Sequence, residues 1–201
     1  EAAEAAYPED LGPTSRNNAH LAFTCVDEVA YHPVIVDAVS DLIGPDITFM
    51  VDANYSMSID EAIVAANAFK PYGILWFEEP THVESDNALR QIRENTDVPL
   101  CVGERHFTRW DYWQLLNDRL VDYVMPDVAW CGGISEWRRI ATMAEVQYIR
   151  VSPHDALGPV ALAASFQLSM ATPNLYREEC LHTWFTRMAG LVTPVQHPST
   201  E

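Results

Sequence analysis

Six ionisable side chains recur along the chain at a nearly constant spacing, each at the end of a short apolar run. They are Asp52, Glu78, Glu104, Asp127, His154 and Glu179. Successive members are separated by 26, 26, 23, 27 and 25 residues, the scale of one strand and one helix with their connections. A single carboxylate after a strand can be a helix N-cap, but six such groups at one period predict a common site.

The first three members are carboxylates, which cannot face a common point without compensation. Their mutual repulsion would raise their pKa values or push the groups apart. A divalent cation removes this conflict, and all-oxygen ligands at a site open to water and substrate suit Mg2+. We therefore predict a Mg2+ site formed by Asp52, Glu78 and Glu104.

Asp127 and His154 follow adjacent predicted strands and could form a hydrogen bond. An aspartate that fixes one imidazole nitrogen orients the ring, raises its basicity and makes the other nitrogen a general base. A lone histidine after a strand is usually structural. The place of His154 in the series of six favours a catalytic role instead.

The elements that must position these groups are seven short apolar runs, which we predict as strands. They cover residues 21–27, 47–52, 74–80, 99–104, 121–127, 148–154 and 174–180. None alternates between apolar and polar residues as a half-exposed antiparallel strand does. Continuous apolar runs of this length are typical of strands buried on both faces of a parallel sheet.

Helical patterns fill the gaps between these strands. Ser58 and Glu61 form a capping box that opens a helix ending near residue 69, and Ser85 or Asp86 can cap the next helix. Further helices are predicted at 33–43, around 110–116, at 134–145 and at 160–170. Strand–helix alternation with short connections requires right-handed βαβ units.

Seven strands fit an open doubly wound sheet or most of a (β/α)8 barrel, and a barrel brings the ends of successive strands to one mouth. A complete barrel takes about 250 residues, so the 201 residues of this chain are short for one. We expect an α/β fold, a parallel (β/α) barrel over residues 21–185. A partly disordered segment at 1–20 would precede it, and a tail at 186–201 would follow.

The charge balance excludes some classes of partner. Twelve Lys and Arg against 29 Asp and Glu give a formal net charge of −17. Such a surface repels phosphate backbones, so we expect no nucleic-acid partner. A high-salt cytoplasm would explain the acidic, lysine-poor composition, and a GC-rich genome would also favour Arg over Lys.

No apolar stretch approaches the roughly 18 residues that a membrane span needs, and residues 1–10 lack the basic and apolar regions of a signal peptide. The four cysteines lie far apart without a CxxC pair, so we expect buried reduced thiols. These features predict a soluble, cytoplasmic protein with no membrane partner.

Five segments make the sequence recognisable: VDAN (51–54), WFEEP (76–80), GERHFTRW (103–110), MPDVAWCGGISE (125–136) and SPHDALGPVALAAS (152–165). Over about residues 20–180 the chain resembles the enolase superfamily, in particular its mandelate racemase subgroup and the sugar-acid dehydratases of the galactonate type. The resemblance assigns the same three carboxylates to Mg2+ and the dyad to Asp127 and His154. It places Glu179 against the substrate.

The family's fold is a capping domain on a modified barrel. We expect this chain to begin after the capping domain and the first barrel strand, so that it is a fragment or is completed by other chains. Relatives commonly assemble, and an unfinished barrel exposes an edge strand that invites pairing. A homo-oligomer is therefore expected.

The chemistry that the resemblance implies is a dehydration. His154 takes the proton next to the carboxylate of a sugar acid, Mg2+ stabilises the resulting enolate, and loss of the β-hydroxyl gives a 2-keto-3-deoxy acid. Glu179, if protonated, could donate a hydrogen bond to the developing charge. The alternatives are an epimerase or cycloisomerase on the same scaffold, and a non-catalytic truncated barrel that serves as a binding or assembly subunit.

The sequence departs from the family at two positions. Many relatives carry a Lys-x-Lys base on the second strand, but residues 22–28 hold no lysine, which favours one-base chemistry through His154. Galactonate dehydratases place a histidine two residues after the first metal ligand, where this chain has Asn54, which cannot give up a proton at neutral pH. The acid for the leaving hydroxyl is then His154, Tyr55 or a water at the metal.

Four residues are predicted to line the mouth and contact the substrate: Asn54, Arg105, His106 and Trp130. Arg105 could meet a substrate carboxylate or pair with a neighbouring acid. For His106 and Trp130, ordinary packing is the alternative.

Overall fold

The computed structural model describes residues 33–44 and 46–180. The strand predicted at 21–27, Cys25, and the segments at 1–20 and 186–201 lie outside the described residues. The chain is divided into two compact units. The smaller contains helix α3 (Pro33–Ile43) and residues 71–73, and the larger contains the sheet and the helices that follow its strands.

Five parallel strands form the sheet of the larger unit, and their order in the sheet is their order in the sequence. They are β1 (Val51–Asp52), β2 (Phe77–Glu78), β3 (Leu100–Val102), β4 (Tyr123–Val124) and β5 (Arg150–Val151). Each lies inside a predicted apolar run. The run at 174–180 contributes only a bridge from Leu175 to Val151, also parallel.

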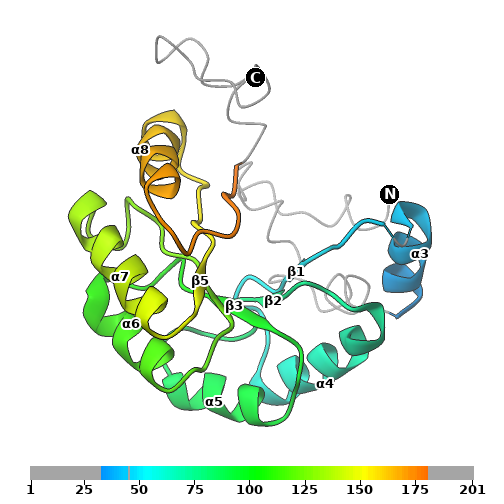
Figure 1. The fold of residues 1–201 in the computed structure, drawn as a ribbon. Coiled ribbons are helices and arrows are strands. Elements are labelled where there is room, and N and C mark those ends of the chain that lie inside the picture. Colours follow the sequence, from blue (N-terminus) through cyan, green and yellow to red (C-terminus); the bar gives the residue numbers. More distant parts are fainter. Residues whose placement is uncertain (1–32, 45, 181–201) are drawn as a thin grey trace, which may run out of the picture. The chain divides into compact units, whose positions relative to one another are not determined.

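One helix follows each strand, and Figure 1 shows these helices in an arc outside the strands. They are α4 (Ile59–Phe69), α5 (Asp86–Glu94), α6 (Thr108–Asn117), α7 (Ile134–Val146) and α8 (Pro159–Met170), with a short 3-10 helix at Lys70–Tyr72. This is the βα repeat that a parallel barrel requires, and the predicted α/β fold is confirmed for this part of the chain.

The helix starts follow the capping chemistry of the sequence. Ser58 and Glu61 form the predicted capping box of α4, and the Ser85 hydroxyl accepts from the Ala88 N–H at the start of α5. Gly133, at φ +86, precedes α7. A side chain there would be strained, so glycine suits the turn from β4 into this helix.

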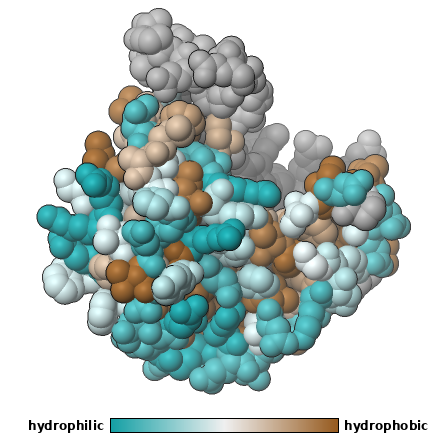
Figure 2. Space-filling model, viewed as in Figure 1, coloured by the Kyte–Doolittle hydropathy of each residue, from teal (hydrophilic) through white to brown (hydrophobic). Residues whose placement is uncertain are grey.

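Apolar side chains between the sheet and the helices form the core. Phe77, Leu100 and Val124 on the strands are fully buried, as is Trp137 on α7. Helix α5 buries Leu89 and Ile92 and leaves its other side polar, and Figure 2 shows hydrophilic side chains over the lower part of this face, where α5 lies.

Helix α6 buries a different side from the one that its tryptophans suggest. Tyr112, Leu115 and Leu116 are buried, whereas Trp110 is 75% exposed and Trp113 is 55% exposed. The spacing of large apolar residues therefore predicts the helix but not the side that faces the core.

Among the described cysteines, Cys101 and Cys131 are buried and free, and Cys180 is free and half-buried. The expectation of buried thiols is thus confirmed for the first two. No helix in the described residues is both long and apolar enough to cross a membrane.

Candidate active site

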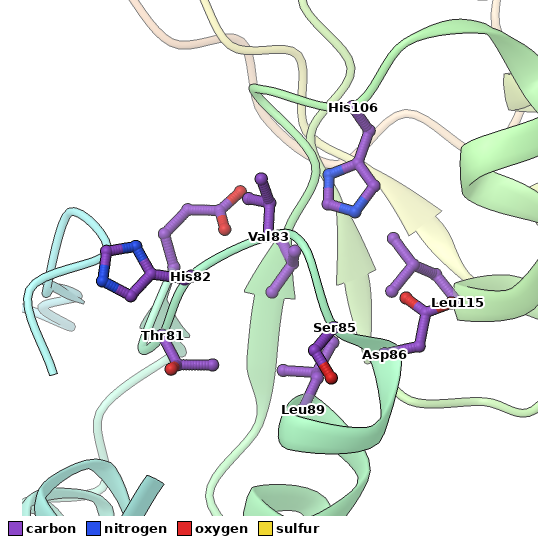
Figure 3. Close-up of a pocket in the computed structure, with 10 residues that line it drawn as sticks. Thr81, His82, Val83, Ser85, Asp86, Leu89, His106 and Leu115 are labelled. Atoms are coloured by element: carbon purple, nitrogen blue, oxygen red, sulfur yellow. The ribbon is translucent and has the colours of Figure 1, made fainter. Parts of the chain in front are cut away.

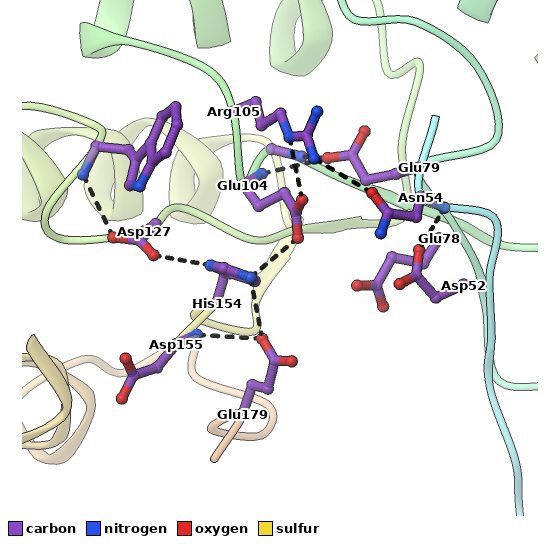
Figure 4. Close-up of polar contacts among 12 residues, drawn as sticks. Asp52, Asn54, Glu78, Glu79, Glu104, Arg105, Asp127, His154, Asp155 and Glu179 are labelled. Carbon is purple, nitrogen blue, oxygen red and sulfur yellow. Dashed lines mark hydrogen bonds and ion pairs between the residues drawn. The ribbon is translucent and has the colours of Figure 1, made fainter. Parts of the chain in front are cut away.

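The predicted site residues lie at the carboxyl end of the sheet because they end, or closely follow, parallel strands. Asp52 and Glu78 are the last residues of β1 and β2 and are register partners. Glu104, Asp127 and His154 stand in the loops after β3, β4 and β5. Figure 4 shows Asp52 beside Glu78, and His154 among the other acidic residues.

His154 lies between three carboxylates. Its Nδ1 is 2.7 Å from Oδ2 of Asp127, and its Nε2 is 3.0 Å from Oε2 of Glu104 and 3.7 Å from Oε2 of Glu179 (Figure 4). Burial alone would lower the pKa of His154, but the hydrogen bonds to Asp127 and Glu104 overcome it and raise that pKa to about 11. These contacts therefore favour the charged form of the ring.

Asp127 is held so that only one oxygen faces the imidazole. Its side chain is 1% exposed, and its Oδ1 accepts from the backbone N–H groups of Ala129 at 2.7 Å and Trp130 at 3.3 Å. Oδ2 is left for Nδ1 of His154. This anchoring assigns the Nδ1 proton to the aspartate side and leaves Nε2 as the atom that can exchange a proton with a substrate.

Glu104 is the nearest acidic partner of Nε2. Although burial favours its neutral form, the hydrogen bond with His154 holds the pKa of Glu104 below its ordinary value. Its Oε1 lies 3.6 Å from Nε of Arg105. Of the two roles predicted for Arg105, the structure shows the pairing with a neighbouring acid.

In the described part of the chain, no ion pair joins a basic side chain to Asp52 or Glu78. Burial, and then repulsion from Asp52, raise the pKa of Glu78 to about 8, against a hydrogen bond that Trp76 Nε1 donates at 2.8 Å. Asp52 keeps contact with solvent, yet desolvation, with repulsion from Glu104 as a smaller cause, raises its pKa to about 6. Burial and mutual repulsion thus disfavour the charged forms of Asp52 and Glu78.

The side-chain chemistry of Asp52, Glu78 and Glu104 suits a divalent cation, but the distances between these side chains in the structure do not. No three His, Cys, Asp or Glu side chains of the described residues are gathered closely enough to hold a metal ion, and Glu104 is turned toward His154. The predicted convergence on one point is therefore not seen. Hard anionic oxygens from three consecutive strands, with the pKa values of Asp52 and Glu78 raised, are nevertheless the donor set that Mg2+ prefers.

Glu179 stands at the open side of this group. Its Oε2 accepts from the backbone N–H of Asp155 at 3.1 Å, and its side chain is 35% exposed. The same Oε2 lies 3.7 Å from Nε2 of His154, so Glu179 contacts the ring atom that Asp127 leaves free.

Asn54 and Arg105 lie together in the structure. The Arg105 guanidinium donates to Oδ1 of Asn54 at 3.2 Å and lies 3.9 Å from the centre of the Tyr55 ring. Arg105 is exposed, so its remaining N–H groups are open to a ligand. Both residues border the predicted metal ligands Asp52 and Glu104 in the sequence.

The contacts that the structure shows for the side chains of His106 and Trp130 are packing contacts. His106 is 6% exposed and packs against Tyr112, with ring centres 5.4 Å apart. It lines a small pocket, shown in Figure 3 with Ser85 and Leu115. The Trp130 ring packs on Phe107 at 5.7 Å.

Two residues of this region were missed by the sequence reasoning, Trp76 and Glu79. Trp76 lies two positions before Glu78, so the strand period places both on one side, where the indole N–H reaches the carboxylate. Glu79 is 1% exposed, and its Oε1 accepts from the backbone N–H of Gly103 at 2.5 Å. The doubled acid of the WFEEP segment was the available signal for Glu79.

Comparison with known protein families shows to which family this chain belongs. The family described as "Enolase C-terminal domain-like" matches residues 17–199. The chain belongs to this family. Within the enolase superfamily it is a C-terminal barrel domain of the mandelate racemase/muconate lactonizing enzyme subgroup, and the predicted membership is confirmed.

Sugar-acid enzymes stand among its relatives. The D-galactonate dehydratase family member of Streptomyces bingchenggensis is 38% identical over 149 residues, 73% of this chain and 36% of that protein. The D-galactarolactone cycloisomerase of Agrobacterium fabrum is 38% identical over 144 residues, 71% of this chain and 38% of that protein. The crystal structure of a mandelate racemase/muconate lactonizing enzyme-like protein from Rubrobacter xylanophilus gives a TM-score of 0.71 at 39% identity.

That structure is matched over 77% of this chain and 40% of its own length. The chain therefore spans about two fifths of the proteins it resembles. Further relatives, 30 to 34% identical, are named dehydratases of gluconate, mannonate and arabinonate. The superfamily's barrel domain thus occurs in several hydro-lyases of sugar acids.

Proposed function

We propose that this chain is the catalytic barrel part of a Mg2+-dependent dehydratase that acts on an aldonate or aldarate. The observation that carries the proposal is the pair formed by His154 and Asp127. Nδ1 is fixed by an anchored carboxylate, and Nε2 faces the open side of the site. The sugar-acid dehydratases among the relatives support the substrate class.

His154 is proposed as the base that removes the proton next to the substrate carboxylate. It must be neutral to do so, whereas its contacts with Glu104 and Glu179 favour the charged ring. A ligand that engages Glu104 would remove one of these contacts and lower the pKa of His154 toward the working range of a general base. Asp127 would then stabilise the imidazolium formed by proton transfer.

Asp52, Glu78 and Glu104 would hold the Mg2+, which as a Lewis acid supplies stabilisation for the negative charge on the substrate carboxylate. Compensation of their own charge would favour ionised Asp52 and Glu78. The proposed contribution of Glu179 is a hydrogen bond, in its protonated form, to the same developing charge. Arg105 and Asn54 are proposed to bind the substrate.

Loss of the β-hydroxyl needs a proton, and we assign that proton to His154. The proton taken from the α-carbon is returned from Nε2 to the leaving oxygen, so that one water departs and an enol remains. The enol becomes the 2-keto-3-deoxy acid when its β-carbon gains a proton and its hydroxyl loses one. Tyr55 is a poor alternative. Its hydroxyl is buried, and burial together with Glu79 and Glu104 raises its pKa far above the ordinary value.

A cycloisomerase is the second candidate, because the galactarolactone enzyme is as similar to this chain as the galactonate dehydratase family member is. Both reactions begin with proton removal beside a carboxylate. The site residues alone do not separate them, since they differ in what happens to the enolate.

The test is incubation of the chain with Mg2+ and a panel of aldonic and aldaric acids in D2O. The proposal predicts a keto acid, detected as its semicarbazone, from at least one acid, and none from His154→Asn. Deuterium in unreacted substrate with inversion, or a lactone isomer, would favour an epimerase or a cycloisomerase. No reaction together with no saturable Mg2+ binding would indicate a non-catalytic subunit. Light scattering tests the expected homo-oligomer, and fractionation of cells tests the cytoplasmic location.

A further inference from the structure

Glu79 is a buried acid that the proposed chemistry does not use. It directly follows Glu78, and its backbone adopts φ +37, a left-handed conformation that is uncommon for a residue with a side chain. Strain of this kind persists where surrounding contacts impose it, and it concentrates at functional sites. We therefore ask which contacts hold Glu79 in this conformation and what they position.

The Glu79 carboxylate holds the backbone from which Glu104 projects. Oε1 accepts from the N–H of Gly103 at 2.5 Å and from the N–H of Glu104 at 3.2 Å. The Glu79 main chain also joins both neighbouring strands, because its N–H donates to the Cys101 carbonyl at 3.1 Å and its carbonyl accepts from the Tyr55 N–H at 2.8 Å. One residue thus ties together the turns after β1 and β3.

Gly103 is confined from its other sides as well. Its φ is +143, and a Cβ atom would lie 3.1 Å from the backbone nitrogen of Met125 and 3.1 Å from a ring carbon of Tyr112. Its carbonyl accepts from the Tyr112 hydroxyl at 2.6 Å. The turn is thus held by a carboxylate at its N–H groups, by a hydroxyl at its carbonyl, and by the Met125 backbone and the Tyr112 ring beside its α-carbon. These contacts restrict the backbone at Gly103 and Glu104, and so the direction in which the Glu104 side chain leaves the backbone.

We propose that Glu79 is a positioning residue, whose carboxylate fixes the Gly103–Glu104 backbone and so sets where the Glu104 side chain can bind. The inference rests on the proposed function only for what Glu104 binds. Groups that orient metal ligands from behind commonly change metal affinity when replaced. The acceptor oxygen of Glu79 is the feature required.

The test compares Glu79→Gln, which keeps an acceptor oxygen in the same place, with Glu79→Leu, which does not. Mn2+ is the probe, and its binding to the whole chain is followed by electron paramagnetic resonance. Glu79→Leu is expected to weaken binding by about 10- to 100-fold, and Glu79→Gln is expected to retain most of the affinity. Equal affinity of Glu79→Leu and the parent chain would overturn the proposal.

A matched control is available at Glu136, a carboxylate that is 8% exposed and binds Arg109 on the outer helices. Glu136→Leu also removes a buried acid but should leave Mn2+ affinity unchanged. An equal loss of affinity in this variant would show that general destabilisation, and not positioning, is the cause. If Glu79→Leu does not fold, Glu79→Met supplies a more adaptable apolar side chain.

A second readout does not depend on metal. Amide hydrogen exchange at Gly103 and Glu104 should accelerate at least about 10-fold in Glu79→Leu and not in Glu136→Leu, because a lost acceptor frees these N–H groups. If the parent chain binds no Mn2+, the proposed metal site fails, and the exchange rates still decide the role of Glu79. Unchanged exchange would contradict it.

Discussion

Nδ1 of His154 lies 2.7 Å from Oδ2 of Asp127, although the two residues are 27 positions apart in the sequence. The contact arises because β4 and β5 are parallel neighbours, so that the loops after them leave the sheet on the same side. The anchoring of Asp127 by two backbone N–H groups fixes the pair before any ligand binds. Preorganisation of this kind is what a general base requires.

Asp127→Asn tests the pair while keeping its shape. The amide cannot stabilise an imidazolium as a carboxylate does, so we expect the rate of α-proton exchange to fall by about 100-fold or more. Exchange is measured by NMR with a substrate acid in D2O, and circular dichroism confirms an intact fold. An unchanged rate would remove Asp127 from the mechanism.

Glu136 predicts an acid-sensitive contribution to stability. Hydrogen bonds from Arg109 lower the pKa of Glu136 to about 2, below its ordinary value of 4.5. Because the folded value lies below the unfolded one, this contribution is complete above the unfolded pKa and is lost as the pH falls toward 2.

The measurement is urea unfolding of the parent chain and Glu136→Gln across this pH range. The parent should be more stable at neutral pH, and the difference between the two should shrink steadily in acid. A difference that is independent of pH would show that the ion pair with Arg109 contributes nothing through its charge.

His106→Phe tests the small pocket that His106 lines. Nδ1 of His106 is buried without a partner in the described residues, and burial lowers the pKa of the ring to about 4. Phenylalanine keeps the contact with Tyr112 and removes the unsatisfied nitrogen, so stability should be unchanged or should rise by about 1 kcal/mol. Urea unfolding measures this. A loss of more than about 1 kcal/mol would mean that Nδ1 has a hydrogen-bond partner such as a buried water.

The parallel fold could be predicted from the sequence because each strand lies in a continuous apolar run, and because helices α4 and α5 begin at serine N-caps. The capping box at Ser58 and Glu61 is an example in which local chemistry determines the start of a helix. Polar residues at the strand ends could be predicted for the same reason, since the period of the βα repeat is visible in the spacing.

Other features depend on contacts between residues far apart in the sequence, which no local sequence pattern predicts. The sequence does not show that His106 is buried, because its surroundings come from α5 and α6. It does not show that Glu79 turns away from Glu78 to reach the turn after β3, since that depends on a left-handed backbone. Nor does it show that Glu104 contacts His154, because Glu104, Asp127 and Glu179 all lie near the same imidazole ring.

The most direct test of the account is a titration of the chain with Mg2+ by calorimetry. If Asp52, Glu78 and Glu104 form a cation site, the parent should bind one Mg2+ per chain, and Glu78→Gln should lose that binding while Glu136→Gln keeps it. Absence of saturable binding in the parent, or full binding in Glu78→Gln, would contradict the account.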